Sequence, residues 1–193
     1  MVALSQILVA LSDSATKCDF DRFIYPVRSL KWPQRHKLPI EETRRAMLKE
    51  LLTQDVISLH DSAENWQQAI ELACQPLIDN GAIEPSYVEA IFKSHQEMGP
   101  YYVIGPGIAM PHARPENGVN RLALGLTVIR NGVNFDADEN DPVKMLVTLA
   151  ATDSNSHVDA IAQLAELFMN EEHVAQICAA QDVAAIRRII ETY

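Results

Sequence analysis

The stretch Val143-Lys144-Met145-Leu146-Val147-Thr148-Leu149-Ala150-Ala151 is almost continuously apolar. Pro142 precedes this run, and the polar segment Thr152-Asp153-Ser154-Asn155-Ser156 follows it. A short apolar run between such boundaries is typical of a β-strand that is covered on both faces. The stretch therefore predicts the central strand of an α/β fold.

The segments around this strand continue the α/β pattern. Runs rich in β-branched and aromatic residues predict three more strands, at Val56–Leu59, Tyr101–Ile104 and Leu122–Ile129, the last with alternating polarity. Apolar residues at helical spacing, with capping residues beside them, predict helices at about 65–80, 85–98, 157–170, 172–179 and 183–192. Asn131-Gly132 predicts a turn, and residues 136–141 predict an exposed acidic segment.

Composition limits the classes of function. The chain has 193 residues, 48% of them hydrophobic, which suits one ordinary domain with an appendage. A net charge of −10 argues against nonspecific binding of nucleic acid and is compatible with a basic protein partner. No run approaches the roughly 20 apolar residues of a membrane span, so direct membrane insertion is not expected. Cys18, Cys74 and Cys178 are widely spaced, which predicts neither a disulfide framework nor a zinc site and fits the reducing cytoplasm.

The charge is unevenly distributed along the chain. Residues 1–46 hold eight Lys or Arg and five Asp or Glu, a net charge of +3. Because the whole chain has a net charge of −10, residues 47–193 have a net charge of −13. The first part has three Xaa-Pro pairs and no sustained period of either kind. We interpret 1–46 as an N-terminal extension that is poorly structured or arises from an alternative start at Met47, and 47–193 as the domain. A true arm that packs on the body or on a partner is the other interpretation.

The candidate chemistry lies in the segment Gly105-Pro106-Gly107-Ile108-Ala109-Met110-Pro111-His112-Ala113-Arg114-Pro115-Glu116. Two glycines and three prolines predict that neither a long helix nor a regular central strand runs through it. The trio 108–110 can enter the core, while Pro111 fixes the backbone just before His112. An imidazole with a pKa near 6.5 is mostly neutral at pH 7 and can act as a nucleophile or a ligand.

A second histidine lies in a comparable position. His157 follows the predicted central strand and lies in the first turn of the next predicted helix. Sites in α/β sheets form beyond the carboxyl ends of strands, and helix starts offer N–H groups to a phosphoryl group. The rings of His112 and His157 can therefore face one anionic site. His36, His60, His95 and His173 have no such setting and are predicted to be surface residues.

Three further side chains are candidates at this site, each with an ordinary alternative. Arg114 either contacts the phosphoryl group, because a guanidinium matches oxyanion geometry, or is a solvated loop charge. Ser154 and Ser156 either donate to phosphate or cap the following helix. Glu116 or Asp153 can orient one of the two imidazole rings through its second nitrogen.

The motif resembles a known family. Gly107-Ile108-Ala109-Met110-Pro111-His112-Ala113, followed about 45 residues later by Ser156-His157 before an apolar helix, is similar to the mannitol/fructose-type enzyme IIA of the bacterial phosphoenolpyruvate-dependent sugar phosphotransferase system. The resemblance covers 47–193. Residues 99–107 and the string from His112 to Glu116 are most similar to the ascorbate-type and cryptic-mannitol-type branch.

The resemblance implies a fold and a function. The implied fold is a mixed central β-sheet flanked by α-helices on both faces. The implied function is a phosphotransferase that takes phosphate from the phosphocarrier HPr on His112 and passes it to an enzyme IIB. The transfer would serve uptake of ascorbate or a mannitol-like polyol through a membrane IIC permease. His157 would help to hold the phosphoryl group, and no metal or other cofactor would be used.

One departure and two alternatives remain at this point. Mannitol-type members usually carry an arginine in the helix before the active loop, where this chain has Lys93-Ser94-His95. We hypothesise that Arg114 replaces it. The first alternative function is a regulatory nitrogen-type IIA, whose phosphorylation state controls partner proteins. The second is a metal-dependent hydrolase that uses His112, His157 and Asp153, although no histidine pair has the spacing of a common zinc motif.

Overall fold

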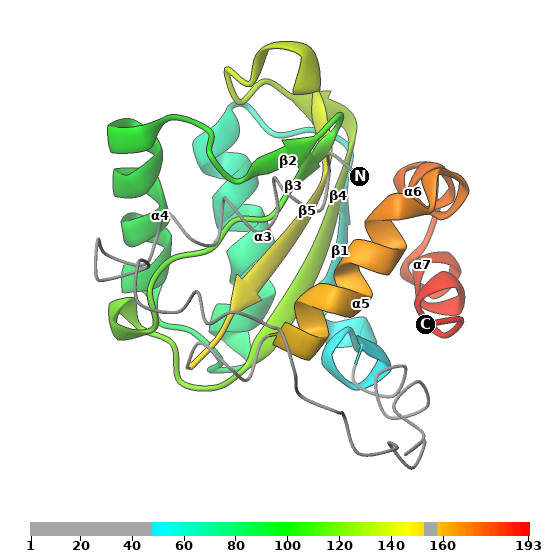
Figure 1. The fold of residues 1–193 in the computed structure, drawn as a ribbon, viewed down its shortest axis with the longest axis horizontal. Coiled ribbons are helices and arrows are strands. Elements are labelled where there is room, and N and C mark those ends of the chain that lie inside the picture. Colours follow the sequence, from blue (N-terminus) through cyan, green and yellow to red (C-terminus); the bar gives the residue numbers. More distant parts are fainter. Residues whose placement is uncertain (1–47, 153–157) are drawn as a thin grey trace, which may run out of the picture.

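The computed structural model describes residues 48–152 and 158–193, whose strands form one mixed five-stranded sheet in the order β1-β4-β5-β3-β2 (Figure 1). The strands are β1 Ile57–His60, β2 Val103–Gly105, β3 Ile108–Ala109, β4 Ala123–Val133 and β5 Val143–Ala150. β5 is antiparallel to β4 and parallel to β3. β1 is parallel to β4, and β2 is antiparallel to β3. The carboxyl ends of β3 and β5 therefore lie at the same edge of the sheet, where the arrow of β5 points in Figure 1.

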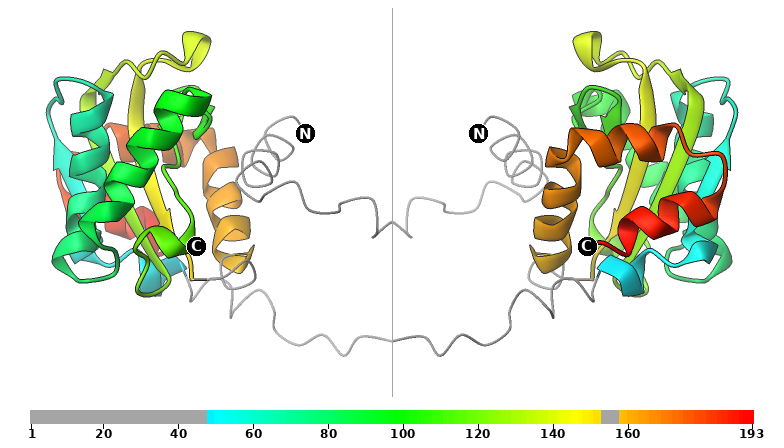
Figure 2. Two further views of the ribbon diagram at one scale, coloured as in Figure 1. Left: turned by 90° about the vertical axis from the view of Figure 1, so that its left-hand side faces the viewer. Right: turned by 90° about the vertical axis from the view of Figure 1, so that its right-hand side faces the viewer.

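Helices cover both faces of this sheet, as predicted. The first face carries α3 (Trp66–Asp79) and α4 (Pro85–Met98), and the second carries α5 (Val158–Met169), α6 (Glu171–Cys178) and α7 (Val183–Ile190) (Figures 1 and 2). Short 3-10 helices lie at Gln54–Val56 (η2), Pro115–Asn117 (η3) and Asp138–Asn140 (η4). None of the helices within 48–152 and 158–193 combines the length and the apolar character that crossing a membrane requires.

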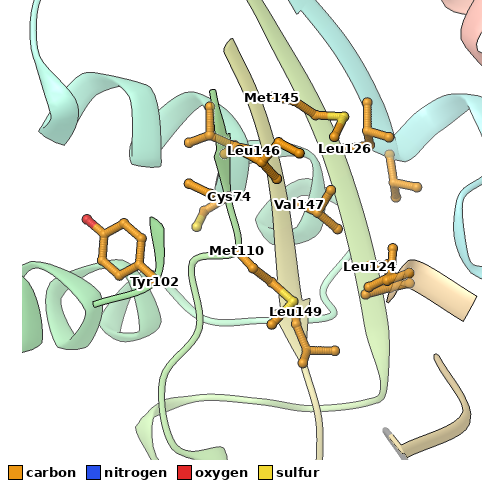
Figure 3. Packing of buried hydrophobic residues seen from close by; sticks show 14 of the residues in the cluster. Cys74, Tyr102, Met110, Leu124, Leu126, Met145, Leu146, Val147 and Leu149 are labelled. Atoms are coloured by element: carbon orange, nitrogen blue, oxygen red, sulfur yellow. The ribbon is translucent and has the colours of Figure 1, made fainter. Parts of the chain in front are cut away.

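The central strand is confirmed. Every residue of β5 except Lys144 is buried, because helices cover both faces and β4 and β3 cover both edges. Figure 3 shows side chains of β5, including Met145, Leu146 and Leu149, packed among apolar residues of β4 and the α3 face. Burial of one such side chain is worth roughly 1.5–3 kcal/mol, so this layer supplies much of the driving force for folding.

The predicted turn at Asn131-Gly132 is wrong, because both residues belong to β4. The pairing with β5 shifts register between Val128 and Val133, and Gly132 has a φ of 71° within this irregularity. Glycine accepts a left-handed backbone without a steric penalty, so it serves here as a bulge residue and not as a hairpin turn. The predicted alternation is also absent, since residues 123–129 are all buried between the two helical layers.

The acidic segment is only partly exposed. Asp136, Asp138 and Glu139 face solvent, as predicted. Asp141 instead accepts backbone hydrogen bonds from Phe135 at 2.9 Å and from Ala137 at 2.7 Å, and these two apolar residues are buried. The carboxylate therefore closes the loop between β4 and β5.

The histidine-bearing segment contains more regular structure than its prolines and glycines predict. The strand expected at Tyr101–Ile104 lies at Val103–Gly105, and Ile108–Ala109 forms a second strand between β5 and β2. The expectation that no regular central strand runs through the segment is therefore wrong, although the strand that does has only two residues. A two-residue strand fits between Pro106 and Pro111 without placing a proline in the hydrogen-bonded ladder.

The first described residues belong to the packed body. Leu48 and Leu52 are fully buried. The Leu48 N–H donates to Gln163 Oε1 at 2.9 Å, and Arg187 donates to the Lys49 carbonyl at 2.7 Å. Residues 1–47 lie outside the described part, so the assignment of 1–46 as an extension stays a prediction.

Candidate active site

The loop that carries His112 is held along β5 by backbone hydrogen bonds. The Gly107 carbonyl accepts from the N–H groups of Lys144 and Met145, at 2.9 and 3.0 Å. Further along, the Leu149 N–H donates to the Pro111 carbonyl at 3.1 Å. The chain therefore follows β5 from its start to its end, which places His112 at the carboxyl edge of the sheet. As expected, residues 108–110 are buried in the core.

The imidazole of His112 is held in one tautomer. Its side chain is buried, with 5% relative exposure, and Nδ1 lies 2.9 Å from the Met110 carbonyl oxygen. A carbonyl can only accept, so Nδ1 carries the proton in this bond. The neutral ring then has its lone pair on Nε2. This is the form in which Nε2 can act as a nucleophile.

Two tyrosine hydroxyls bind the peptide that follows His112. The Tyr101 hydroxyl donates to the His112 carbonyl at 2.8 Å, and the Tyr101 ring meets the imidazole edge-on at a centroid distance of 5.4 Å. The Tyr87 hydroxyl accepts from the Ala113 N–H at 2.9 Å and donates to the Leu149 carbonyl at 2.6 Å. Burial raises the pKa of both phenols, so both hydroxyls are protonated at neutral pH.

A hollow of about 400 Å³ lies beside this peptide, between α4 and the segment that follows His112. We call it the α4 hollow, and its lining includes Lys93, Ser94, Met98, Tyr101 and Arg114. Met98, which lines the hollow, is 50% exposed. The hollow therefore opens next to Tyr101 and to the peptide that Tyr101 binds.

Arg114 lines the α4 hollow together with Lys93 and Ser94, the residues found where the resemblance predicts an arginine. Its Nη1 lies 3.8 Å from Glu116 Oε1, and both side chains are more than half exposed. Lys93, also exposed, lies 4.0 Å from Glu97. Exposed pairs of this kind are weak, worth about 0–1 kcal/mol, so neither carboxylate holds its partner firmly. Glu116 thus lies beside Arg114, whereas Nδ1 of His112 is oriented by the Met110 carbonyl.

Four of the sequence candidates lie outside the described residues: Asp153, Ser154, Ser156 and His157. The described chain leaves the sheet where β5 ends at Ala150 and resumes at Val158, where α5 begins. Their roles stay predictions. The metal-hydrolase alternative depends on two of them, Asp153 and His157, and within 48–152 and 158–193 there is no group of three residues able to hold a metal ion.

The prediction that His95 is a surface residue is wrong. His95 is buried, its ring stacks on Trp66 at a centroid distance of 3.8 Å, and its Nδ1 lies 2.6 Å from the Tyr102 hydroxyl. It lies four residues after Ile91 on the inward face of α4, so helical spacing was the signal that could have identified it. His60 and His173 are partly buried, and His173 Nδ1 lies 2.7 Å from the Tyr193 hydroxyl.

We expect His95 to make stability depend on pH. Burial lowers the pKa of His95, and the Asp136 carboxylate only partly offsets this effect. Below a pH of about 6.5 the unfolded chain therefore binds a proton that the folded protein resists, so stability is complete above that pH and falls as the pH drops toward the folded pKa. His95→Gln should reduce this slope and lower stability at pH 7 by about 1–2 kcal/mol. Urea unfolding at pH 7.5, 6.5 and 5.5 measures both, and an unchanged slope would contradict the assignment.

Sequence reasoning missed Tyr87 and Tyr101 as site residues. Tyr87 is fully buried in the first turn of α4, four residues before Ile91 on the same inward stripe. A buried tyrosine needs a hydrogen-bond partner for its hydroxyl, which was the available signal that it bonds to something inside. Which backbone groups it binds is set only by the tertiary structure.

Comparisons with known proteins identify the family. The family model described as "Phosphoenolpyruvate-dependent sugar phosphotransferase system, EIIA 2" matches residues 50–193. The ascorbate-specific PTS system EIIA component of Escherichia coli (strain K12) is 38% identical over 136 residues, which cover 70% of this chain and 88% of that protein.

Solved structures agree as well. The solution structure of the mannitol-specific cryptic phosphotransferase enzyme IIA from Escherichia coli is 38% identical, with a TM-score of 0.70, and covers 76% of this chain and 99% of its own. The enzyme IIA of mannitol in complex with phosphorylated enzyme IIB, also from Escherichia coli, is 23% identical with a TM-score of 0.64 over 74% of this chain and all of that one, a likeness of fold alone. Together with the buried histidine at the carboxyl edge of a mixed sheet, these matches establish that the chain belongs to the EIIA type-2 family of the phosphoenolpyruvate-dependent sugar phosphotransferase system.

Proposed function

We propose that this phosphotransferase accepts its phosphoryl group on Nε2 of His112. The observation that carries the proposal is the hydrogen bond from Nδ1 to the Met110 carbonyl, because it fixes the ring in the tautomer with the lone pair on Nε2. In the transfer, the lone pair forms a bond to phosphorus while the bond from phosphorus to the donor's histidine nitrogen breaks. In onward transfer, a nucleophile of the next carrier forms a bond to phosphorus while the bond from phosphorus to Nε2 of His112 breaks.

The proposed donor is HPr, and the proposed acceptor is an enzyme IIB that in turn serves a membrane IIC permease. Members of this family function with an enzyme IIB, and the mannitol IIA that shares this fold is known in complex with phosphorylated IIB. The net charge of −10 favours partners with basic surfaces, since complementary charge speeds association. A cytoplasmic location follows from such partners. Nothing in the proposal needs nucleic acid, a metal or another cofactor.

The proposed transport substrate is ascorbate or a mannitol-like polyol. The relatives that share 38% identity are specific for ascorbate and for mannitol. A carrier of this kind contacts proteins and not the sugar, so substrate choice is decided by the IIB and IIC partners. The likeness to transport components also favours transport over the regulatory, nitrogen-type alternative.

A relay assay tests transport against regulation. Protein labelled with [32P]phosphate through HPr is mixed with purified ascorbate-type or mannitol-type IIB. We expect the label to move to at least one IIB within seconds and to leave this chain. Label that stays on this chain with every IIB, while HPr still accepts it back, would favour the regulatory alternative.

His157, Ser154 and Ser156 are proposed as groups that hold the phosphoryl oxygens, and Arg114 is proposed to replace the family arginine. The position of Arg114 supports this, because it shares the α4 hollow with Lys93 and Ser94, the residues at the place of that arginine. Guanidinium groups match phosphate oxygens in geometry and charge.

Replacement of Arg114 by alanine is expected to slow phosphoryl acceptance from HPr about tenfold, the effect of losing one charge-assisted hydrogen bond. Arg188→Ala is the matched control, because Arg188 is an exposed arginine on α7, away from the loop. Stopped-flow or quenched labelling gives both rates. Equal rates in the two variants would discard the role of Arg114.

A further inference from the structure

The peptide unit between His112 and Ala113 is bound on both sides by tyrosine hydroxyls. Its carbonyl accepts from Tyr101 at 2.8 Å, and its N–H donates to Tyr87 at 2.9 Å. Both polar groups of one peptide are thus satisfied by side chains, whereas most backbone groups in a fold bond to other backbone groups. The arrangement falls directly after the residue proposed to carry phosphate.

The two tyrosines are anchored independently of each other. Tyr87 lies in the first turn of α4, is fully buried, and donates to the Leu149 carbonyl of β5 at 2.6 Å. Tyr101 lies in the turn between α4 and β2. Its ring also packs against Tyr102 at a centroid distance of 5.1 Å. The peptide is therefore tied to α4, to β5 and to the turn after α4.

We propose that Tyr87 and Tyr101 form a positioning clamp that fixes the orientation of the His112 imidazole for phosphoryl transfer. The inference rests on the proposed role of His112. Fixing the 112–113 peptide sets the backbone angle ψ of His112, and the bond from Nδ1 to Met110 sets the ring torsion. With both fixed, Nε2 can point in only one direction.

The clamp has a purpose in a protein that transfers phosphate between two other proteins. Donor and acceptor both approach the same ring, and a misplacement of about 1 Å can lower a transfer rate by about a hundredfold. All clamp contacts come from this chain, so the imidazole keeps one orientation whichever partner is bound. Tyr101 also lines the α4 hollow, where it meets the exposed surface beside the site.

The contacts of the neighbouring Tyr102 make it a matched control. Its hydroxyl bonds to His95 Nδ1 at 2.6 Å, whereas the carbonyl and the N–H of the 112–113 peptide bond to Tyr101 and Tyr87. It is more deeply buried than Tyr101. Tyr102→Phe therefore removes a buried hydroxyl bond of the same type while leaving the clamp in place, so it separates loss of stability from loss of positioning.

The test compares Tyr101→Phe, Tyr87→Phe and Tyr102→Phe with the wild-type protein. In unphosphorylated protein, 15N NMR of the imidazole reports which ring nitrogen holds the proton. We expect the wild type and Tyr102→Phe to show the proton on Nδ1 of His112, and Tyr101→Phe to show averaging between the two tautomers. Transfer from HPr should slow about three- to tenfold in Tyr101→Phe and at least as much in Tyr87→Phe, but less than twofold in Tyr102→Phe.

The outcomes separate the clamp from the proposed function. A His112 tautomer and a transfer rate in Tyr101→Phe that match those of Tyr102→Phe would overturn the clamp. The NMR comparison needs no phosphate, so it decides the clamp even if the wild type takes no phosphate on His112, which would overturn the proposed function alone. Tyr101 is only partly buried, so its phenylalanine variant keeps the fold and gives an answer should Tyr87→Phe be unstable.

Discussion

Phosphoryl acceptance from HPr is expected to fall at least about a thousandfold in His112→Gln, because the variant has no nucleophilic nitrogen. Glutamine is the informative replacement. Its amide can still donate to the Met110 carbonyl, which is the bond that Nδ1 makes in the native loop. The loss should therefore be chemical, with little change in the thermal unfolding midpoint.

His60→Gln is the matched control for this variant. His60 lies at the end of β1, and β1 runs antiparallel to β5, so His60 is at the opposite edge of the sheet from His112. We expect it to be labelled at the wild-type rate. Labelling of His112→Gln to the wild-type level would show that another residue accepts the phosphate.

The second large effect is expected at His157. Replacing it by glutamine should slow transfer about a hundredfold, the usual cost of removing one preorganised donor to developing negative charge. Unlike His112→Gln, this variant should still reach nearly full labelling, because the nucleophile is intact. Quenched time courses with labelled HPr separate the slower rate from the final extent.

His173→Gln serves as the control for His157. It removes a partly buried histidine from α6, where Nδ1 bonds to the Tyr193 hydroxyl. Its transfer rate should stay near wild type. A His157→Gln protein that transfers as fast as this control would remove His157 from the site and leave His112 to act with other groups.

The sequence was sufficient to predict the fold class and the main candidate. A strand as apolar as 143–151 is stable only when other elements cover both of its faces, and both faces of β5 are covered. Proline before His112 and an apolar trio before it predicted a histidine held at the end of a buried segment, which the structure confirms. These features are local, so they can be read from neighbouring residues.

The remaining features depend on residues far apart in the chain. Tyr87 binds groups 26 and 62 positions away, so its partners cannot be read from local pattern. Asn131-Gly132 has the composition of a turn, but pairing of Val133 with Val143 keeps it in a strand. His95 is a different case, because its helical spacing from Ile91 was visible in the sequence and predicts an inward position. Tertiary context overrides local preference in the first two cases.

The most direct test of the account is the position of the phosphate. The protein is incubated with phosphoenolpyruvate, enzyme I and HPr, digested at neutral to alkaline pH, and mapped by mass spectrometry for acid-labile phosphate. The account predicts a single phosphorylated peptide, with the phosphate on His112. Phosphate on any other residue, or none while HPr itself is phosphorylated, would contradict it.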